Sequence, residues 1–263
     1  MVRLVTAMLL LPALAAAGDE AGGGFWLKRL AEAARINRGP ARRFVFQEEI
    51  ARFKEEPPGR KHYARRTYEV SFLEGENYYK LIAENGAPLA IGDALEEQDR
   101  FLRAEQYRKR TPLEVRRKKA AREERNRLKF DLETLARTHK ATVVGQDAIG
   151  GRDVVIVDVV PAGKPRKPGN RNQWARILAG RIWLDTASGF PARAEMRQLI
   201  AWGMQAKGST AVFEWIHIDG AWLISSIRSS EPGFGGGVLV TEQRYSSYSR
   251  FQADIKLTFQ AIP

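Results

Sequence analysis

The sequence predicts an α+β protein that is mainly β, built on a large antiparallel sheet with one apolar face. Over residues 180–259 apolar and polar side chains alternate, as in Arg193-Ala194-Glu195-Met196-Arg197, and turn residues interrupt the alternation. Such alternation sends successive side chains to opposite faces of a strand. Between residues 94 and 139 the period changes to that of a helix. A sheet with one apolar face must cover it with helices, fold round it or fill it with a ligand.

Residues 1–17 have the pattern of a signal peptide. Met1-Val2-Arg3 supplies a short positive end, residues 4–14 are apolar, and Ala15-Ala16-Ala17 is a small-residue cleavage pattern. The apolar stretch is shorter than the roughly 20 residues that span a bilayer. An anchored or buried N-terminal helix is the alternative. The chain has no cysteine, which excludes disulfides and lipid attachment at an N-terminal cysteine. We therefore expect a periplasmic protein that is exported, soluble and not lipid-anchored.

The first part of the mature chain predicts a helix and then a strand meander. Residues 18–40 read as a flexible, glycine-rich start followed by an amphipathic helix over Phe25 to Asn37, which Gly39-Pro40 closes. Alternation then predicts strands over residues 43–52, 63–73 and 78–83. The segments between them, residues 56–59 and 74–77, carry turn residues.

Residues 92–140 predict a basic helical insertion. One helix is expected over residues 94–110, and a second begins near Thr111-Pro112-Leu113-Glu114, which has the arrangement of a capping box. The second helix is expected to run to about His139, with Leu128, Leu132 and Leu135 forming its apolar stripe.

Strands resume after the insertion. They are expected over residues 141–145, 153–160, 181–185, 191–202, 209–219, 221–230, 238–246 and 250–259. The run Val154-Val155-Ile156-Val157 predicts a strand that is buried on both faces. About ten or eleven strands are enough for a sheet to curl strongly or close. No long linker divides the chain, so we expect one domain over residues 41–263.

Three short segments resemble an established family. Residues 180–191, with Trp183, Asp185, Ser188 and Pro191, look like the W-x-D-x-x-(S/T)-x-x-P hairpin of exported outer-membrane lipoprotein-sorting proteins of the LolA/LolB-like superfamily. Residues 151–157 and 245–251 resemble two further elements of it. The resemblance spans roughly residues 42–259. It implies an unclosed, strongly curved antiparallel β-barrel whose concave apolar face is covered by helices and accepts acyl chains.

This chain also departs from the carriers, because they are smaller and their membrane-anchored member needs a lipid-modified cysteine that is absent here. We therefore expect a related carrier or sensor that binds lipid acyl chains or lipoproteins. The residues expected to line the cavity are Trp183, Met196, Trp202, Phe213, Trp215, Leu128 and Leu132. Ordinary core is the alternative role for each of them, because a pocket cannot be told from a core by sequence.

One segment of the insertion, residues 108–129, carries most of the excess positive charge of a chain whose formal net charge is +12. Residues 108–129 contain eleven Lys or Arg and three Glu. Since export removes the chain from nucleic acids, an anionic envelope surface is the expected polyanion, with Arg116, Arg117, Lys118 and Lys119 as contacts. The alternative is a solvated helix face with local ion pairs. A scaffold protein that binds a partner through these helices is therefore a second expected function.

The sequence does not predict an enzyme. His62, His139 and His217 are scattered, and none has the spacing of a metal pair on one helix face. The glycines at 233–237 are followed by a strand and no Lys-Ser/Thr pair, so they do not form a phosphate loop. We expect no catalytic residue, no metal and no cofactor. The sequence leaves the oligomeric state open.

Overall fold

The structure is a computed structural model that describes most of the chain. The described residues are 20–56, 59–116, 118–119, 130–165, 167, 169, 171–203, 205–233 and 235–251. The expected signal peptide, Arg117 and Leu128 lie outside them. So do residues 252–259, the greater part of the last expected strand.

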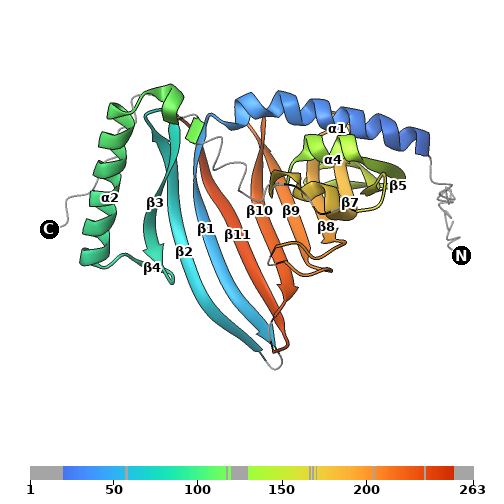
Figure 1. Ribbon diagram of the computed structural model, residues 1–263. Helices are drawn as coiled ribbons and strands as arrows, with labels where there is room; N and C mark the ends of the chain where they lie inside the picture. Colours follow the sequence, from blue (N-terminus) through green and yellow to red (C-terminus); the bar gives the residue numbers. More distant parts are fainter. Residues whose placement is uncertain are drawn as a thin grey trace, which may run out of the picture.

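Within the described residues, eleven strands form one antiparallel sheet, as the alternation predicted (Figure 1). Their order is β4-β3-β2-β1-β11-β10-β9-β8-β7-β6-β5, so that β4 and β5 are free edges and the sheet is not closed. Neighbouring strands in the sheet are consecutive in the chain, except that β1 pairs with β11. The bounds are β1 Phe44–Glu56, β2 Gly59–Leu73, β3 Glu76–Glu84, β4 Ala87–Pro88, β5 His139–Ile149, β6 Arg152–Pro161, β7 Leu178–Asp185, β8 Pro191–Gln198, β9 Thr210–Ile218, β10 Ala221–Pro232 and β11 Val238–Arg250.

The helices are α1 Glu20–Ala41, α2 Ile91–Arg110, α4 Leu132–Thr138 and the 3-10 helix η1 Arg171–Ile177. The described part of the helix expected from about Pro112 to about His139 is helical over residues 113–116, 118–119 and 132–138, but it is broken at Phe130 and Asp131, which are not helical. Asp131 instead caps α4 and accepts a hydrogen bond from the Glu133 N–H at 3.2 Å. His139, expected at the helix end, begins β5.

Two further strand predictions need correction. The strand expected to reach Trp202 ends at Gln198, and Trp202 lies in the loop between β8 and β9. The strand expected over 238–246 continues to Arg250 as β11. The last expected strand, over 250–259, lies outside the described residues beyond Phe251. Ser247 has a φ of +54° where the register with β1 shifts, so a bulge carries the ladder through a segment that reads as a break.

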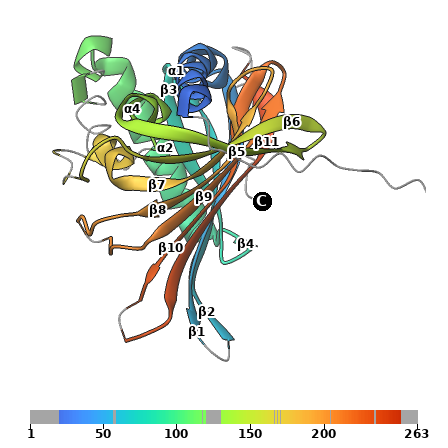
Figure 2. The same ribbon diagram turned by 90° about the vertical axis from the view of Figure 1, so that its right-hand side faces the viewer.

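Helix α1 lies across the sheet and begins at Glu20, earlier than the expected Phe25 (Figure 2). The glycines expected to be a flexible start are part of it. A Cβ on Gly23 would lie 1.8 Å from the carbonyl oxygen of Ala141 on β5, so a glycine lets the helix approach the strand closely. Beyond this contact, Leu27 and Leu30 join the main buried cluster of the sheet. We call the face of the sheet that α1 covers the inner face.

Strand register extends the inner face across the molecule. Phe213 of β9 is opposite Ile227 of β10, Ile227 is opposite Gln243 of β11, and Gln243 is opposite Ile50 of β1. These residues therefore point to the same side. The residues that contact α2 point to the other side, since Tyr78 pairs with Ser71 while its neighbour Tyr79 pairs with Val70 and Val70 with the inner-face Phe46.

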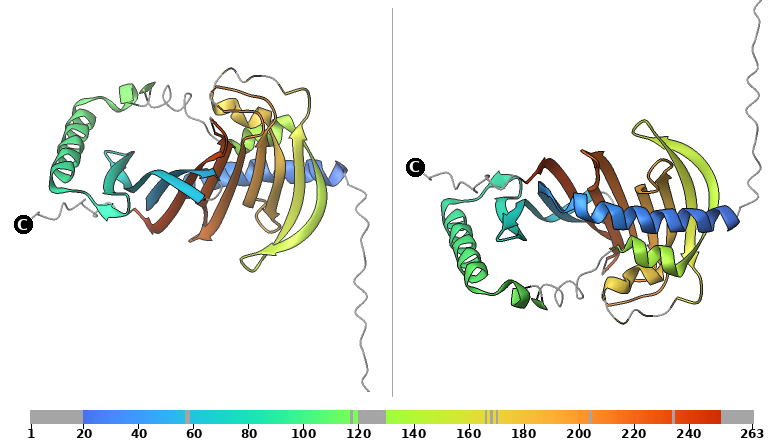
Figure 3. Two further views of the ribbon diagram at one scale, coloured as in Figure 1. Left: turned by 90° about the horizontal axis from the view of Figure 1, so that it is seen from below. Right: turned by 90° about the horizontal axis from the view of Figure 1, so that it is seen from above.

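Helix α2 consequently does not cover the inner face, in contrast to the helices that the family resemblance implied. Phe101 of α2 packs edge-on against Tyr78, with ring centroids 5.3 Å apart, next to Leu73. Figure 3 shows α2 beyond the β3–β4 edge of the sheet, whereas α1 lies over the strands toward the β5 edge. The helices that contribute to the inner-face core are α1, α4 and η1.

The hairpin between β7 and β8 shows what the Trp183-x-Asp185 motif does structurally. The Asp185 carboxylate accepts hydrogen bonds from the Ser188 N–H and hydroxyl, both at 2.7 Å, and from Arg152 Nε at 2.7 Å. Burial alone would raise the pKa of Asp185, but these bonds hold it below its usual range. Arg29 of α1 donates to the carbonyl of Ala187 at 2.6 Å, so the motif fixes a turn that contacts α1.

No helix in the described part of the chain has both the length and the apolar character needed to cross a membrane.

Candidate functional site

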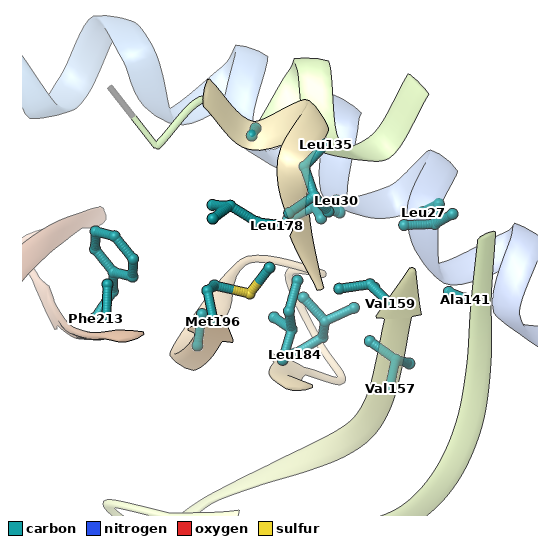
Figure 4. Packing of buried hydrophobic residues seen from close by; sticks show 14 of the residues in the cluster. Leu27, Leu30, Leu135, Ala141, Val157, Val159, Leu178, Leu184, Met196 and Phe213 are labelled. Atoms are coloured by element: carbon teal, nitrogen blue, oxygen red, sulfur yellow. The ribbon is translucent and has the colours of Figure 1, made fainter. Parts of the chain in front are cut away.

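The expected acyl-binding wall over β8 and β9 is filled by side chains. Met196 and Phe213 are buried in the main cluster together with Leu27, Leu30 and Leu135 (Figure 4). The ring of Phe213 also stacks on that of Phe130, with centroids 4.3 Å apart. This part of the inner face is therefore core, which is the alternative that the sequence left open.

The other expected lining residues divide between core, outer face and a groove. Leu132 and Trp215 are partly buried and pack against the same cluster. Trp183 lies on the outer face, since its neighbour Ile182 is the one opposite the inner-face Ala194, and the Arg193 guanidinium lies 5.7 Å from its ring centroid. Trp183 and Met196 also line a shallow cavity of about 690 Å³ between β6, β7, β8 and β9, and Trp202 lines a groove on the part of the inner face beyond the helices.

This groove has a volume of about 640 Å³ and lies between the β8–β9 loop and the far ends of β1, β2, β10 and β11. Figure 1 shows these strands extending well beyond α1 and α4. We call it the tip groove. It is lined by Arg52, Phe53, Tyr63, Trp202, Gly203, Gln205, Glu231, Leu239, Val240 and Thr241.

Strand register places the tip groove on the inner face. Arg52 is two residues beyond the inner-face Ile50, and Thr241 is its partner on β11. Leu239, two residues before Thr241, is opposite Glu231 of β10. The groove is thus the continuation of the apolar inner face at the end of the sheet that the helices leave uncovered.

A buried glutamine holds the loop that forms the other wall. The Gln198 side chain donates to the carbonyls of Ile200 and Gln205, at 2.9 and 3.3 Å, and accepts from Trp174 Nε1 at 2.8 Å. Trp202 and Gln205 then exchange two backbone hydrogen bonds, at 3.0 and 3.2 Å. Gly203, with a φ of +61°, makes the tight turn between them. Trp202 is therefore presented by a small, internally bonded loop.

A lining residue of the groove has a buried polar atom whose hydrogen-bonding capacity is unused. Gln205 Oε1 is buried and has no hydrogen-bond donor among the described groups. A buried polar atom without a partner costs about 1–3 kcal/mol. Gln205 lines the groove but this oxygen is buried, and the other polar side chains that line the groove include those of Arg52, Glu231 and Thr241.

Sequence reasoning missed Tyr63, Gln205 and Leu239. Leu239 lies in a segment that was expected to be a strand, but alternation does not reveal which of the two sets of alternating side chains faces a groove. Gln205 gave no signal, because its role depends on the fold of the β8–β9 loop. Tyr63, whose side chain is largely exposed, was read only as the start of a strand.

The basic candidates have separate roles. Arg116 is buried, donates to the carbonyls of Thr111 and Glu74 at 3.2 and 3.1 Å, and pairs with Glu76 at 3.3 Å. It therefore fastens the β2–β3 turn to the chain after α2. Lys118 and Lys119 are exposed, and Lys119 Nζ lies 5.2 Å from the ring centroid of Tyr107. Arg117 lies outside the described residues.

Arg108 fastens the same turn from α2, donating to the carbonyls of Leu73, Glu76 and Asn77 at 2.8 to 3.0 Å. Its burial lowers the pKa of the guanidinium from its ordinary value, against the effect of Glu76. In the described ranges no group of three or more His, Asp and Glu side chains is arranged to hold a metal ion.

No protein-family model and no curated protein matches this chain. Among solved structures, a Vibrio parahaemolyticus domain named for outer membrane lipoprotein sorting is similar at 12% identity and a TM-score of 0.40, over 91% of this chain and 96% of that one. A LolA superfamily protein from Nitrosomonas europaea is similar at 11% identity and a TM-score of 0.34, over 86% and 94%. The MucA/MucB complex from Pseudomonas aeruginosa is similar at 12% identity and a TM-score of 0.26, over 88% of this chain and 100% of that one.

The structural similarity to LolA-superfamily, lipoprotein-sorting and MucB structures thus extends across most of the chain. It agrees with the resemblance that residues 180–191 predicted. At these identities and TM-scores the similarity says nothing about the ligand, which has to be inferred from the groove itself.

Proposed function

We propose that this protein is an exported, non-catalytic carrier or sensor of the cell envelope that binds an acyl chain of a lipid or lipoprotein in the tip groove. The observation that carries the proposal is that helices and side chains fill the inner face over β8 and β9 but leave about 640 Å³ beside Trp202 and Leu239. That volume falls within the roughly 300–1,000 Å³ of small-molecule sites. The export pattern of residues 1–17 supports the envelope as its location.

The composition of the groove suits one end of a lipid. Each methylene transferred from water to an apolar wall contributes about 0.8 kcal/mol, so eight buried methylenes would supply about 6 kcal/mol. Arg52 and Glu231 supply charged groups at the same groove.

Two neighbouring residues of β11 provide the test. Leu239 lines the groove, whereas Val238 is adjacent in sequence and points to the other face. In Leu239→Glu a carboxylate would have to be buried with the acyl chain, so lipid recovered by mass spectrometry from the purified protein should fall at least about tenfold. Val238→Glu has the same charge change on the same strand and should keep the lipid.

Two results would contradict the proposal. One is that wild-type protein purified from the envelope carries no lipid or lipopeptide. The other is that Leu239→Glu carries as much as Val238→Glu, in which case the lipid is bound elsewhere.

The second candidate is a scaffold protein whose basic surface binds an anionic surface or a protein partner. Its supporting observation is that Lys118 and Lys119 are exposed. Glutamate substitutions at these two residues should abolish capture of such a partner in pull-down experiments, and Arg116 should be left intact because its loss would free the β2–β3 turn.

A further inference from the structure

The outward face of α1 carries positive charge that the fold does not use. Residues 22–43 contain six Lys or Arg and one acid, Glu32. Arg29 donates to the Ala187 carbonyl and Arg38 pairs with Glu133. The other four cations are exposed and have no ion-pair or hydrogen-bond partner for their side chains within the described part of the chain; they are Lys28, Arg35, Arg42 and Arg43.

Two large apolar side chains share this face. Phe25 is 54% exposed and Ile36 is 60% exposed. The side chains on this face are three or four residues apart along the chain, which places them on one side of a helix. They are Phe25, Lys28, Glu32 and then both Arg35 and Ile36. Leu27, Leu30 and Ala33 occupy the opposite side and are buried against the sheet. The helix is thus apolar toward the sheet and both basic and apolar toward solvent.

A second exposed segment lies at the same end of the molecule. Figures 1 and 2 both place the short helical turn that follows α2 at the end where α1 lies. Leu113 and Val115 on it are 44% and 52% exposed, and Lys118 and Lys119 follow. Cations mixed with exposed apolar side chains therefore occur on both elements of this end.

We propose that the outward face of α1 docks on an anionic lipid bilayer, with Phe25 and Ile36 entering the interface and Lys28 and Arg35 contacting phosphates. Arg42 and Arg43, in the turn directly after the helix, add positive charge at its end. A soluble polyanion would engage the cations but would leave the two apolar side chains in water, so the combination favours a bilayer. This inference makes the anionic partner of the second candidate function specific, moves its site to α1, and does not depend on the tip groove.

The electrostatic part has a measurable size. A Lys or Arg near an anionic bilayer contributes about 1 kcal/mol, so loss of two cations should lower the partition constant about 30-fold. Screening makes this contribution fall as salt rises. The apolar contribution of Phe25 and Ile36 to binding should persist at higher salt, and it should be present with any bilayer.

The test measures co-sedimentation of the exported protein with vesicles of phosphatidylglycerol and phosphatidylethanolamine, and with vesicles of phosphatidylcholine alone. The variant K28E/R35E should bind the anionic vesicles at least about 30-fold more weakly than wild type, because it removes two cations and adds two carboxylates. The variant R197E/K207E is the matched control. It also replaces one Arg and one Lys, both exposed and away from α1, and it lowers the formal net charge equally, from +12 to +8. It should lose little binding.

A site-specific probe tests the apolar contact. Because the chain has no cysteine, Ile36→Cys gives one attachment point for an environment-sensitive dye, and Val160→Cys, 51% exposed on β6, gives the control. Anionic vesicles should shift the emission of the dye at 36 to the blue and leave that at 160 unchanged. Equal binding by both charge variants, or no shift at 36, would overturn the proposal. So would binding to poly-glutamate or an oligonucleotide without binding to the vesicles, since the partner would then be a soluble polyanion.

Discussion

Gly23 provides the sharpest test of how α1 is seated on the sheet. An alanine Cβ at this position would lie 1.8 Å from the Ala141 carbonyl oxygen, whereas ordinary contact begins at 3.4 Å. The helix would have to move away from β5 by about 1.6 Å, the difference between these distances. Overpacking of this kind costs about 1–3 kcal/mol. Gly24, the next residue in the same helix, has nothing within 4 Å of its added Cβ.

The pair Gly23→Ala and Gly24→Ala separates seating from helix propensity. Alanine is favoured over glycine in a helix by about 1 kcal/mol, and this gain applies to both variants. Urea unfolding followed by tryptophan fluorescence should therefore show Gly23→Ala to be less stable than Gly24→Ala by about 1–3 kcal/mol, with similar m-values. If the two variants unfold at the same urea concentration, α1 does not approach β5 as described, and the face assigned to membrane contact would also lose its basis.

Two further predictions concern the N-terminus and a buried histidine. Sequencing of the exported protein should find Gly18 as its first residue, because the small-residue pattern ends at Ala17; a retained Met1 would favour the anchored alternative. Burial lowers the pKa of His139 from its usual 6.5, although the carbonyl oxygens of Leu178 and Leu135 lie 2.8 and 3.1 Å from its ring nitrogens. Between the folded pKa and 6.5 the unfolded chain binds a proton that the folded chain does not, so stability should fall as pH drops below about 6.5. His139→Gln should remove that part of the pH dependence in urea titrations, and an unchanged slope would contradict it.

The strands were predictable because alternation is a local property of the chain. The segment 193–197 alternates one residue at a time, and β8 covers it. Alternation could not show which set of side chains on each strand faces the helices. Trp183 and Ile182 are both large and apolar, yet Ile182 is in the inner-face core and Trp183 lies on the outer face. Only the register with β8 decides between them.

The groove and the charged sites depend on contacts between distant segments. Met196 and Phe213 read as a ligand wall, but Leu30 and Phe130, far away in sequence, fill the space in front of them. Arg116 begins a run of cations that reads as a surface patch, yet it is buried against a turn more than thirty residues earlier. No pattern within the run distinguishes Arg116 from its neighbours, since the distinction lies in Glu74 and Glu76.

The two proposed sites lie at different ends of the long strands. From Phe44, where β1 leaves the α1 end, to Arg52 at the tip groove is eight residues, or about 26 Å at 3.3 Å per residue. A molecule docked through α1 would therefore hold its groove well outside the bilayer, beyond direct reach of an acyl chain still inserted there. Binding at the groove and binding at the bilayer should then be separable: Leu239→Glu should keep vesicle binding, and K28E/R35E should keep lipid already in the groove. If one substitution abolished both vesicle binding and lipid binding, the two sites would not be independent, and the ligand would have to enter the protein from the docked bilayer rather than directly at the groove.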